Sequence, residues 1–266
     1  MDLELAGKAA IVTGGSRGIG KAIARELARE GVDCALVARG REALEASAAE
    51  LAAESGRRVL PLVADTGDDA AVKRMVEQAA AAFGHLDILV NCAAQPGGQA
   101  TPPRLAEITE ELVWADVNVK VLGYLRCARE VAPHMIRRGW GRIVNVSGLA
   151  ARQTGSTIGS MRNVAVVALA KNLADELGPH GINVTVVHPG LTRTEKTAGV
   201  VTRQAQAQGI SEDEVERRLA EGNVLRHLVT AQEIAYVVAF LASPRSVAIN
   251  GDVIAAGGGP TSAIYY

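Results

Sequence analysis

The feature that most constrains the fold of this chain is a glycine-rich turn close to its first residue. The turn follows the apolar run Ala9–Thr13, leads into an alanine-rich amphipathic segment and reads Thr13-Gly14-Gly15-Ser16-Arg17-Gly18-Ile19-Gly20. Glycines at these spacings permit a tight turn and let the backbone approach a phosphate at the amino terminus of the following helix. Strand, turn and helix together predict a dinucleotide-binding unit of a parallel α/β sheet.

The rest of the chain repeats an alternation of short apolar runs and longer amphipathic stretches. Runs such as Ile88-Leu89-Val90 are apolar throughout, as expected where helices cover both faces of a parallel sheet. No linker or repeat interrupts the pattern, so residues 1–266 are expected to form a single doubly wound, Rossmann-type α/β domain. The expected strands are Ala9–Thr13, Asp33–Ala38, Val59–Val63, Ile88–Asn91, Gly141–Val146, Asn183–His188 and Asp252–Ala255. The expected helices are Gly18–Glu30, Arg41–Ser55, Asp69–Phe83, Thr109–Arg138, Gly159–Leu177 and Ala231–Ser243.

Charge and cysteine content argue against several other classes. The 28 Lys and Arg residues nearly balance the 29 Asp and Glu residues, and 3% of the chain is aromatic, so no nucleic-acid partner is expected. No apolar run reaches spanning length, and the charged first residues are unlike a signal peptide, so we expect a cytoplasmic protein without membrane contact. Cys34, Cys92 and Cys127 lack metal-ligand spacing, so we expect reduced thiols and no metal site.

One segment departs from the alternation. Residues 195–228 are polar, and Ser211-Glu212-Asp213-Glu214 forms a capping-box pattern that opens a short helix, which Gly222 can close. An insertion after the carboxyl end of a strand, beside the expected ligand crevice, suits a lid over a substrate. A surface excursion without a function is the alternative.

Several ordered motifs resemble those of the classical short-chain dehydrogenase/reductase family over essentially the whole chain. Asn91-Cys92-Ala93-Ala94 stands where Asn-Asn-Ala-Gly is usual, and Pro189-Gly190-Leu191-Thr192-Arg193-Thr194 fits Pro-Gly-x-x-x-Thr. Ile249-Asn250-Gly251-Asp252-Val253-Ile254 resembles the late Thr-Gly-x-x-Ile signature. The resemblance implies a nicotinamide cofactor, a small-molecule substrate and a homo-oligomer, most often a tetramer.

The motifs also supply a set of candidate cofactor-binding residues. The resemblance implies that Asp65, after the third strand, contacts adenine and that Thr194 contacts the nicotinamide carboxamide. For Asp65 and Asn91, capping of a loop is the alternative. The complete set is Gly14, Ser16, Arg17, Gly18, Ile19, Gly20, Arg39, Asp65, Asn91, Ala93, Pro189, Gly190 and Thr194.

Two arginines favour NADP(H) over NAD(H). An NAD-binding fold usually ends its second strand with an acid that accepts hydrogen bonds from the ribose 2′-hydroxyl, whereas a 2′-phosphate requires a cation. Here that strand ends in Ala38-Arg39 without an acid, and Arg17 lies inside the glycine turn. Both arginines could converge on a 2′-phosphate; a solvated loop position for Arg39 is the alternative.

The catalytic groups implied by the resemblance are missing from their expected positions. The family uses a tyrosine as general acid, a lysine four residues later that lowers the pKa of this tyrosine, and a serine that orients the substrate. Counting back from the anchor Leu173-Ala174-Asp175-Glu176-Leu177 places the tyrosine position at Gly159 and the lysine position at Asn163. The serine position falls on Gly148; Ser147 lies one residue earlier and is the alternative candidate if its strand ends early.

Other residues offer partial substitutes. His188, directly before Pro189, titrates near neutrality and could donate a proton, although capping of its strand is the alternative. Asn118 matches the helix asparagine of the family and could hold a water, with packing at an oligomer core as the alternative. Together with Ser147, these are the candidate catalytic residues. Tyr265 and Tyr266 could reach the crevice of a neighbouring subunit, or else fray.

Two functions therefore remain open. The first is an NADP(H)-dependent oxidoreductase with a non-standard proton donor, acting on a carbonyl, alcohol or enoyl small molecule. The second is a catalytically silent cofactor-binding or partner subunit of an oligomer. The lid-like insertion favours the enzyme, since a lid has little use without a second ligand. Apolar residues near the crevice indicate a partly apolar substrate; these residues are Leu149, Ala150, Ile158 and Met161. Arg162 is expected to face solvent or a subunit boundary.

Overall fold

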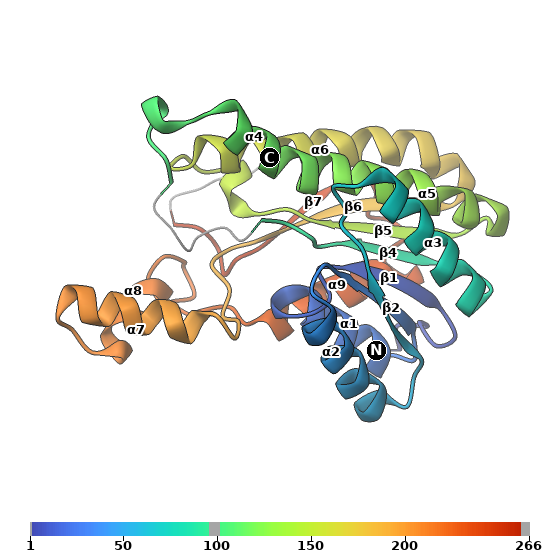
Figure 1. Cartoon of the computed structure of the whole chain (residues 1–266), viewed down its shortest axis with the longest axis horizontal. Helices are drawn as coiled ribbons and strands as arrows, with labels where there is room; N and C mark the ends of the chain where they lie inside the picture. Colours follow the sequence, from blue (N-terminus) through green and yellow to red (C-terminus); the bar gives the residue numbers. More distant parts are fainter. Residues whose placement is uncertain (1, 96–101, 262–266) are drawn as a thin grey trace.

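A parallel sheet of seven strands forms the centre of the computed structural model, which describes residues 2–95 and 102–261 (Figure 1). The strand order is β3-β2-β1-β4-β5-β6-β7, so the chain reverses direction across the sheet between β1 and β4. The predicted doubly wound α/β fold is confirmed. The strands are β1 Ala9–Thr13, β2 Asp33–Ala38, β3 Val59–Val63, β4 Ile88–Asn91, β5 Gly141–Val146, β6 Ile182–Pro189 and β7 Val253–Ala256.

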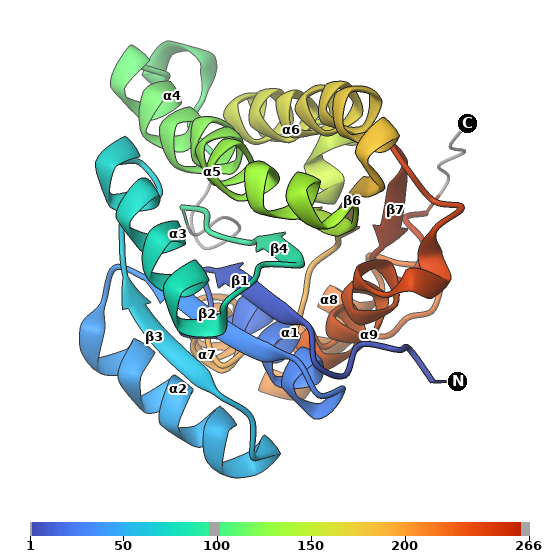
Figure 2. The same cartoon turned by 90° about the vertical axis from the view of Figure 1, so that its right-hand side faces the viewer.

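Helices cover both faces of this sheet (Figures 1 and 2). One face carries α1 Gly18–Arg29, α2 Arg41–Ser55 and α9 Ala231–Ala242; the other carries α3 Asp69–Phe83, α4 Glu110–Val117, α5 Gly123–Arg138 and α6 Thr157–Leu177. Successive side chains of a strand point to opposite faces. In β1, Ala10 and Val12 therefore pack into one hydrophobic core and Ala9 and Ile11 into the other. Both faces of the strand are buried, which explains why the strands are apolar throughout.

The long helix expected at Thr109–Arg138 is interrupted. A π turn at Asn118–Leu122 separates α4 from α5. Each π turn contains more residues than an α turn, so the side chains before it are rotated relative to the face that α5 presents to the sheet. Short 3₁₀ turns occupy Leu105–Glu107, Leu149–Ala151, Gly178–His180 and Pro244–Ser246.

Two helices, α7 Thr197–Gln208 and α8 Glu212–Ala220, project beyond the carboxyl edge of the sheet, at the left of Figure 1. They pack on each other around Val201, Ala205 and Val215. Ser211 caps α8 by accepting a hydrogen bond from the Glu214 amide at 3.2 Å, as the sequence predicts. The Glu214 carboxylate pairs instead with Arg217 and Arg218, and α7 was not expected from the sequence.

None of the helices in the described parts of the chain is both long and apolar enough to cross a membrane. The same residues contain no group of three or more His, Cys, Asp and Glu side chains that could hold a metal ion. Cys34 and Cys127 are buried as free thiols. Tyr265 and Tyr266 lie outside the described residues.

Candidate active site

Two adjoining cavities open at the carboxyl edge of the sheet. The first, of about 500 Å³, runs along the glycine turn, and the second, of about 730 Å³, lies beyond the ends of β5 and β6. Ile19, Cys92, Ala94, Gln95 and Thr194 line both of them. The two cavities therefore form one continuous crevice, with room for two ligands that meet at the shared residues.

Backbone atoms within the glycine turn approach so closely that a side chain at position 20 would not fit. A Cβ on Gly20 would overlap the carbonyl oxygen of Gly14 and lie 2.8 Å from its carbonyl carbon. Gly14 itself has φ of 71°, a left-handed conformation that favours glycine. The Thr13 hydroxyl accepts hydrogen bonds from the amides of Cys92 at 3.0 Å and Ala93 at 3.1 Å, which ties the end of β4 to the turn.

An acidic side chain occupies the amino terminus of α1. Both carboxylate oxygens of Glu195 accept a hydrogen bond from the Gly18 amide, at 3.1 and 3.0 Å. The free amides and the dipole of a helix attract anions at this end. The turn thus already binds anionic oxygen in this structure, which is what a site for a dinucleotide phosphate requires.

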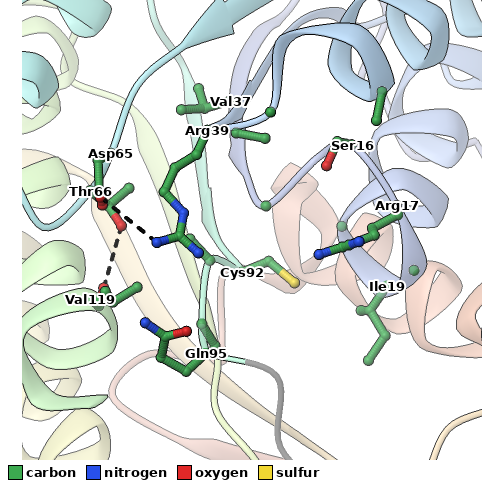
Figure 3. A pocket seen from close by; sticks show the side chains of 18 of the residues that line it. Ser16, Arg17, Ile19, Val37, Arg39, Asp65, Thr66, Cys92, Gln95 and Val119 are labelled. Carbon is green, nitrogen blue, oxygen red and sulfur yellow. Dashed lines mark hydrogen bonds and ion pairs between the residues drawn. The ribbon is translucent and has the colours of Figure 1, made fainter. Parts of the chain in front are cut away.

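Two arginines enter the first cavity from opposite sides (Figure 3). Arg39 lies 3.9 Å from the carboxylate of Asp65, and its side chain is 61% exposed. Arg17 extends from the glycine turn on the far side. Asp65 also caps its own loop by accepting a hydrogen bond from the Gly67 amide at 2.9 Å. Arg39 is therefore held loosely near the cavity rather than locked in an ion pair.

The structure brings nearly all the expected cofactor residues together. Asn91 is the exception: it is buried in β4, where its side-chain amide donates to Asn145 at 2.9 Å, and it lines neither cavity. Its role here is to join β4 to β5, so the expectation of cofactor contact is not supported. Residues lining the first cavity are Gly14, Ser16, Arg17, Gly18, Ile19, Gly20, Arg39, Asp65, Ala93 and Thr194; Pro189 and Gly190 line the second.

The second cavity contains the residues at the expected serine and lysine positions. A Cβ on Gly148 would lie 3.2 Å from the side-chain nitrogen of Asn163, so the two residues face each other. Asn163 is 3% exposed and its side-chain oxygen has no hydrogen-bond partner among the described residues. Ser147 lines the same cavity, and its hydroxyl donates to the Asn163 carbonyl at 3.2 Å. Gly159 is buried and lines neither cavity. A Cβ at this position would lie 2.7 Å from the Ser156 hydroxyl oxygen.

His188 does not fit the role of a proton donor near neutrality. The imidazole is 1% exposed, lines neither cavity, and accepts a hydrogen bond from the Gly148 amide at 3.2 Å. Burial, followed by the charges of Arg152 and Lys120, lowers the pKa of His188 to about 4. The side chain is neutral at physiological pH, so the expectation that it titrates near neutrality is wrong. It holds the backbone of Gly148 in place.

Asn118 also points away from the crevice. Its side-chain nitrogen donates to the Gly67 carbonyl at 3.3 Å, and its oxygen accepts from Arg126 at 2.9 Å. It lines neither cavity. These bonds fix the loop after β3 against the π turn, which is a structural role.

Lys120, two residues further on, is the functional candidate that the sequence analysis missed. It lines the second cavity, is 4% exposed, and its ammonium donates to the Ser147 carbonyl at 2.9 Å. Tyr124, one helical turn later, donates to the preceding carbonyl, that of Val146, at 2.8 Å. A sequence pattern could have indicated this lysine. Lys120 precedes Tyr124 by four residues, so it continues the buried stripe of α5, where a lysine without an acidic partner is unusual.

The second cavity is lined by basic side chains. Arg162 is 12% exposed, pairs with Asp116 and lines the cavity, so it does not face solvent; the expected alternative of a subunit boundary stays a prediction. Lys120, Arg162 and Arg218 line this cavity, whereas no acidic side chain of the described residues does. Of the apolar candidates, Leu149 and Ala150 line it and Ile158 and Met161 do not.

The projecting helices contribute to this second cavity. Arg218 and Leu219 of α8, with Gly222 and Asn223 after it, line the wall opposite the sheet. Glu195, at the start of the same segment, contacts the glycine turn. The segment therefore touches both cavities.

Comparison with known proteins places these features in context. Residues 14–261 match the family model described as "Enoyl-(Acyl carrier protein) reductase". The chain is 35% identical over 256 residues to the short-chain reductase protein NovJ of Streptomyces niveus, covering 94% of this chain and 92% of NovJ. It is 29% identical over 260 residues to the NADPH-dependent reductase BacG of Bacillus subtilis, covering 97% and 99%. L-sorbose reductase from Gluconobacter frateurii, solved with NADPH and L-sorbose, superposes with a TM-score of 0.93 at 29% identity, over 99% of this chain and 100% of that one.

Proposed function

The chain belongs to the short-chain dehydrogenase/reductase family, and from this premise we propose that it is an NADP(H)-dependent oxidoreductase that interconverts a small carbonyl compound and its alcohol. The observation that carries the proposal is the crevice, in which the glycine turn leads into a second cavity lined by basic side chains, with five residues shared between the two. The reductases BacG and L-sorbose reductase, whose names or solved complexes include NADPH, support the choice of cofactor.

The first cavity supplies the contacts that such a cofactor needs. The Gly18 amide and the amino terminus of α1 hold phosphate, Arg17 and Arg39 hold the 2′-phosphate, and Thr194 lies where both cavities meet. Bound there, NADPH supplies a hydride. Segment 195–228 acts as a lid, because α8 lines the substrate cavity and Glu195 reaches the turn.

We also propose that the site departs from the family pattern. Gly148, Gly159 and Asn163 take the positions of the usual serine, tyrosine and lysine, and the chain has no tyrosine between Tyr124 and Tyr236. The usual proton donor is then absent, and a silent cofactor-binding subunit is the competing function. The basic lining of the second cavity and the Asn163 oxygen, which has no partner among the described residues, favour the enzyme, because these polar groups could contact a second ligand.

The test is to follow NADPH absorbance with L-sorbose, ethyl acetoacetate, menadione and a crotonyl thioester, beside a calorimetric NADPH titration. Micromolar NADPH binding with turnover of L-sorbose, ethyl acetoacetate or menadione is the expected result, whereas turnover of the crotonyl thioester alone would indicate an enoyl reductase instead. Binding without any turnover would favour the silent subunit, and absence of binding would refute both functions.

A Glu195→Gln variant is expected to bind NADPH about two- to fivefold more tightly. The Glu195 carboxylate holds the Gly18 amide that the cofactor phosphate needs, and an anion at a helix amino terminus is stabilised by about 0.3–1 kcal/mol. Calorimetry measures the change. Glu221→Gln, an exposed change in the same segment that touches neither cavity, is the control. A weaker affinity for Glu195→Gln would mean that the carboxylate supports binding.

The protein is expected to be a homo-oligomer, most simply a tetramer. Exposed apolar side chains gather on α4 and α6, with Trp114 57%, Met161 54% and Val164 51% exposed. A patch of this kind on neighbouring helices is typical of an interface. Light scattering at micromolar concentration checks this, and a monomer would refute it.

A further inference from the structure

We infer that Lys120 is the group that exchanges a proton with the carbonyl oxygen of the substrate. The inference rests on the proposed function and assigns its missing proton donor. Lys120 lines the second cavity, and its charge interacts with the thiol of Cys92, a residue that lines both cavities. A carbonyl placed at the junction of the two cavities therefore lies beside this side chain.

The ammonium group of Lys120 has capacity for a substrate. It donates one hydrogen bond, to the Ser147 carbonyl, and pairs with no carboxylate among the described residues. An ammonium has three donors, so two are left for other partners. The neighbouring acid, Asp116, pairs with Arg162 instead.

The surroundings of Lys120 favour proton exchange near neutrality. Burial, followed by the charge of Arg162, lowers the pKa of Lys120 to about 7. Arg162 and Asp116, which also face it, form an ion pair with each other. Cys92 and His188 stay neutral in this range, because burial raises the pKa of Cys92 to about 11 and lowers that of His188 to about 4. Lys120 is therefore the group in this part of the described structure that changes charge near pH 7, where a general acid is most effective.

The step balances without any further reactant. The carbonyl carbon accepts the hydride supplied by NADPH, and the electron pair of the C=O π bond moves onto oxygen. That oxygen takes a proton from the Lys120 ammonium: an N–H bond breaks, its electron pair stays on nitrogen, and an O–H bond forms. The neutral amine regains a proton from water. Oxidation of the alcohol runs the same exchange in reverse, with the neutral amine as base.

A purely structural role for Lys120 is the competing explanation. Tyr124 shows what this role looks like, since its hydroxyl binds the Val146 carbonyl from the same helix face. An ammonium is far more costly to bury than a hydroxyl for one such bond. An arginine at position 120 keeps a permanent charge and donors for the Ser147 carbonyl, but does not release a proton near neutrality. The two roles therefore predict different results for Lys120→Arg.

The experiment compares Lys120→Met and Lys120→Arg with Lys73→Met, an exposed control on α3 outside both cavities. Lys120→Met and Lys120→Arg are expected to lose about 10²–10⁴-fold in kcat for reduction and oxidation, with NADPH affinity within about threefold of wild type. Lys73→Met keeps wild-type kinetics. In the wild type, kcat/KM for reduction falls above about pH 7 and that for oxidation rises, because the donor must be protonated and the base neutral.

A readout independent of turnover is the NMR titration of the lysine side-chain carbons in the protein without substrate. One lysine is expected to titrate near pH 7, and its signal is absent from Lys120→Met. Titration of every lysine above pH 9, full activity of Lys120→Arg, or retained turnover in folded Lys120→Met would each overturn the inference while leaving the proposed function intact. Wild-type protein that turns over no carbonyl would instead defeat the proposed function, and the inference with it.

Discussion

A Gly20→Ala variant is expected to bind NADPH roughly 5- to 100-fold more weakly than the wild type and to unfold at a lower temperature. The new methyl group would overlap the backbone of Gly14. That backbone is itself held against Cys92 at the end of β4, because the hydroxyl of the neighbouring Thr13 binds the Cys92 amide. Relief requires movement of the turn, and overpacking of this kind costs about 1–3 kcal/mol. The displaced turn carries the Gly18 amide away from the phosphate.

The control for this change is Gly40→Ala. Gly40 lines the same cavity, but a Cβ there has no atom within 4 Å, and its φ of −86° suits any residue. Calorimetric titration and thermal unfolding of both variants make the comparison. Equal NADPH affinities for the two alanine variants would show that the turn does not hold the cofactor, and would undermine the proposed function at its first step.

Much of this fold could be predicted from the sequence because its signals are local. The strands of a doubly wound sheet are buried on both faces, so β1 and β4 read as apolar runs with clear ends. Only β6 and β7 differ from the expected bounds, by one residue at each end. The amphipathic pattern of α7 was obscured, because this helix packs on α8 in a small separate cluster around Val201, Ala205 and Val215 rather than on the main core.

The active site was harder to predict, because its chemistry depends on contacts between distant segments. Nothing near His188 in the sequence shows that Arg152 and Lys120 approach it and that burial keeps it neutral. Likewise, the π turn directs Asn118 to the loop after β3 and leaves Lys120 lining the crevice. The glycine turn could be found by matching residues to expected positions, because its function depends on backbone shape. Lys120 could not, because the π turn brings its side chain to the crevice.

The choice between cofactors gives the second large effect: Arg39→Ala is expected to weaken NADPH binding about 10- to 100-fold and to leave NADH binding nearly unchanged. A guanidinium that contacts the 2′-phosphate contributes about 1.5–3 kcal/mol through charge-assisted hydrogen bonds, and NADH has no such phosphate. Arg39 is free to make this contact, because its present distance of 3.9 Å to the Asp65 carboxylate is too long for a strong bond.

Asp65 increases the expected loss. Both side chains line the first cavity, and with Arg39 in place its guanidinium offsets the charge of the carboxylate; without it, the 2′-phosphate would face an uncompensated negative charge. Arg41→Ala is the matched control, because Arg41 is 71% exposed, pairs with Glu45 and lines neither cavity. Calorimetry with both cofactors separates the cases. An unchanged preference in Arg39→Ala would assign the phosphate to Arg17 alone, from the opposite wall, whereas equal affinities of the wild type for NADPH and NADH would remove the role of both arginines.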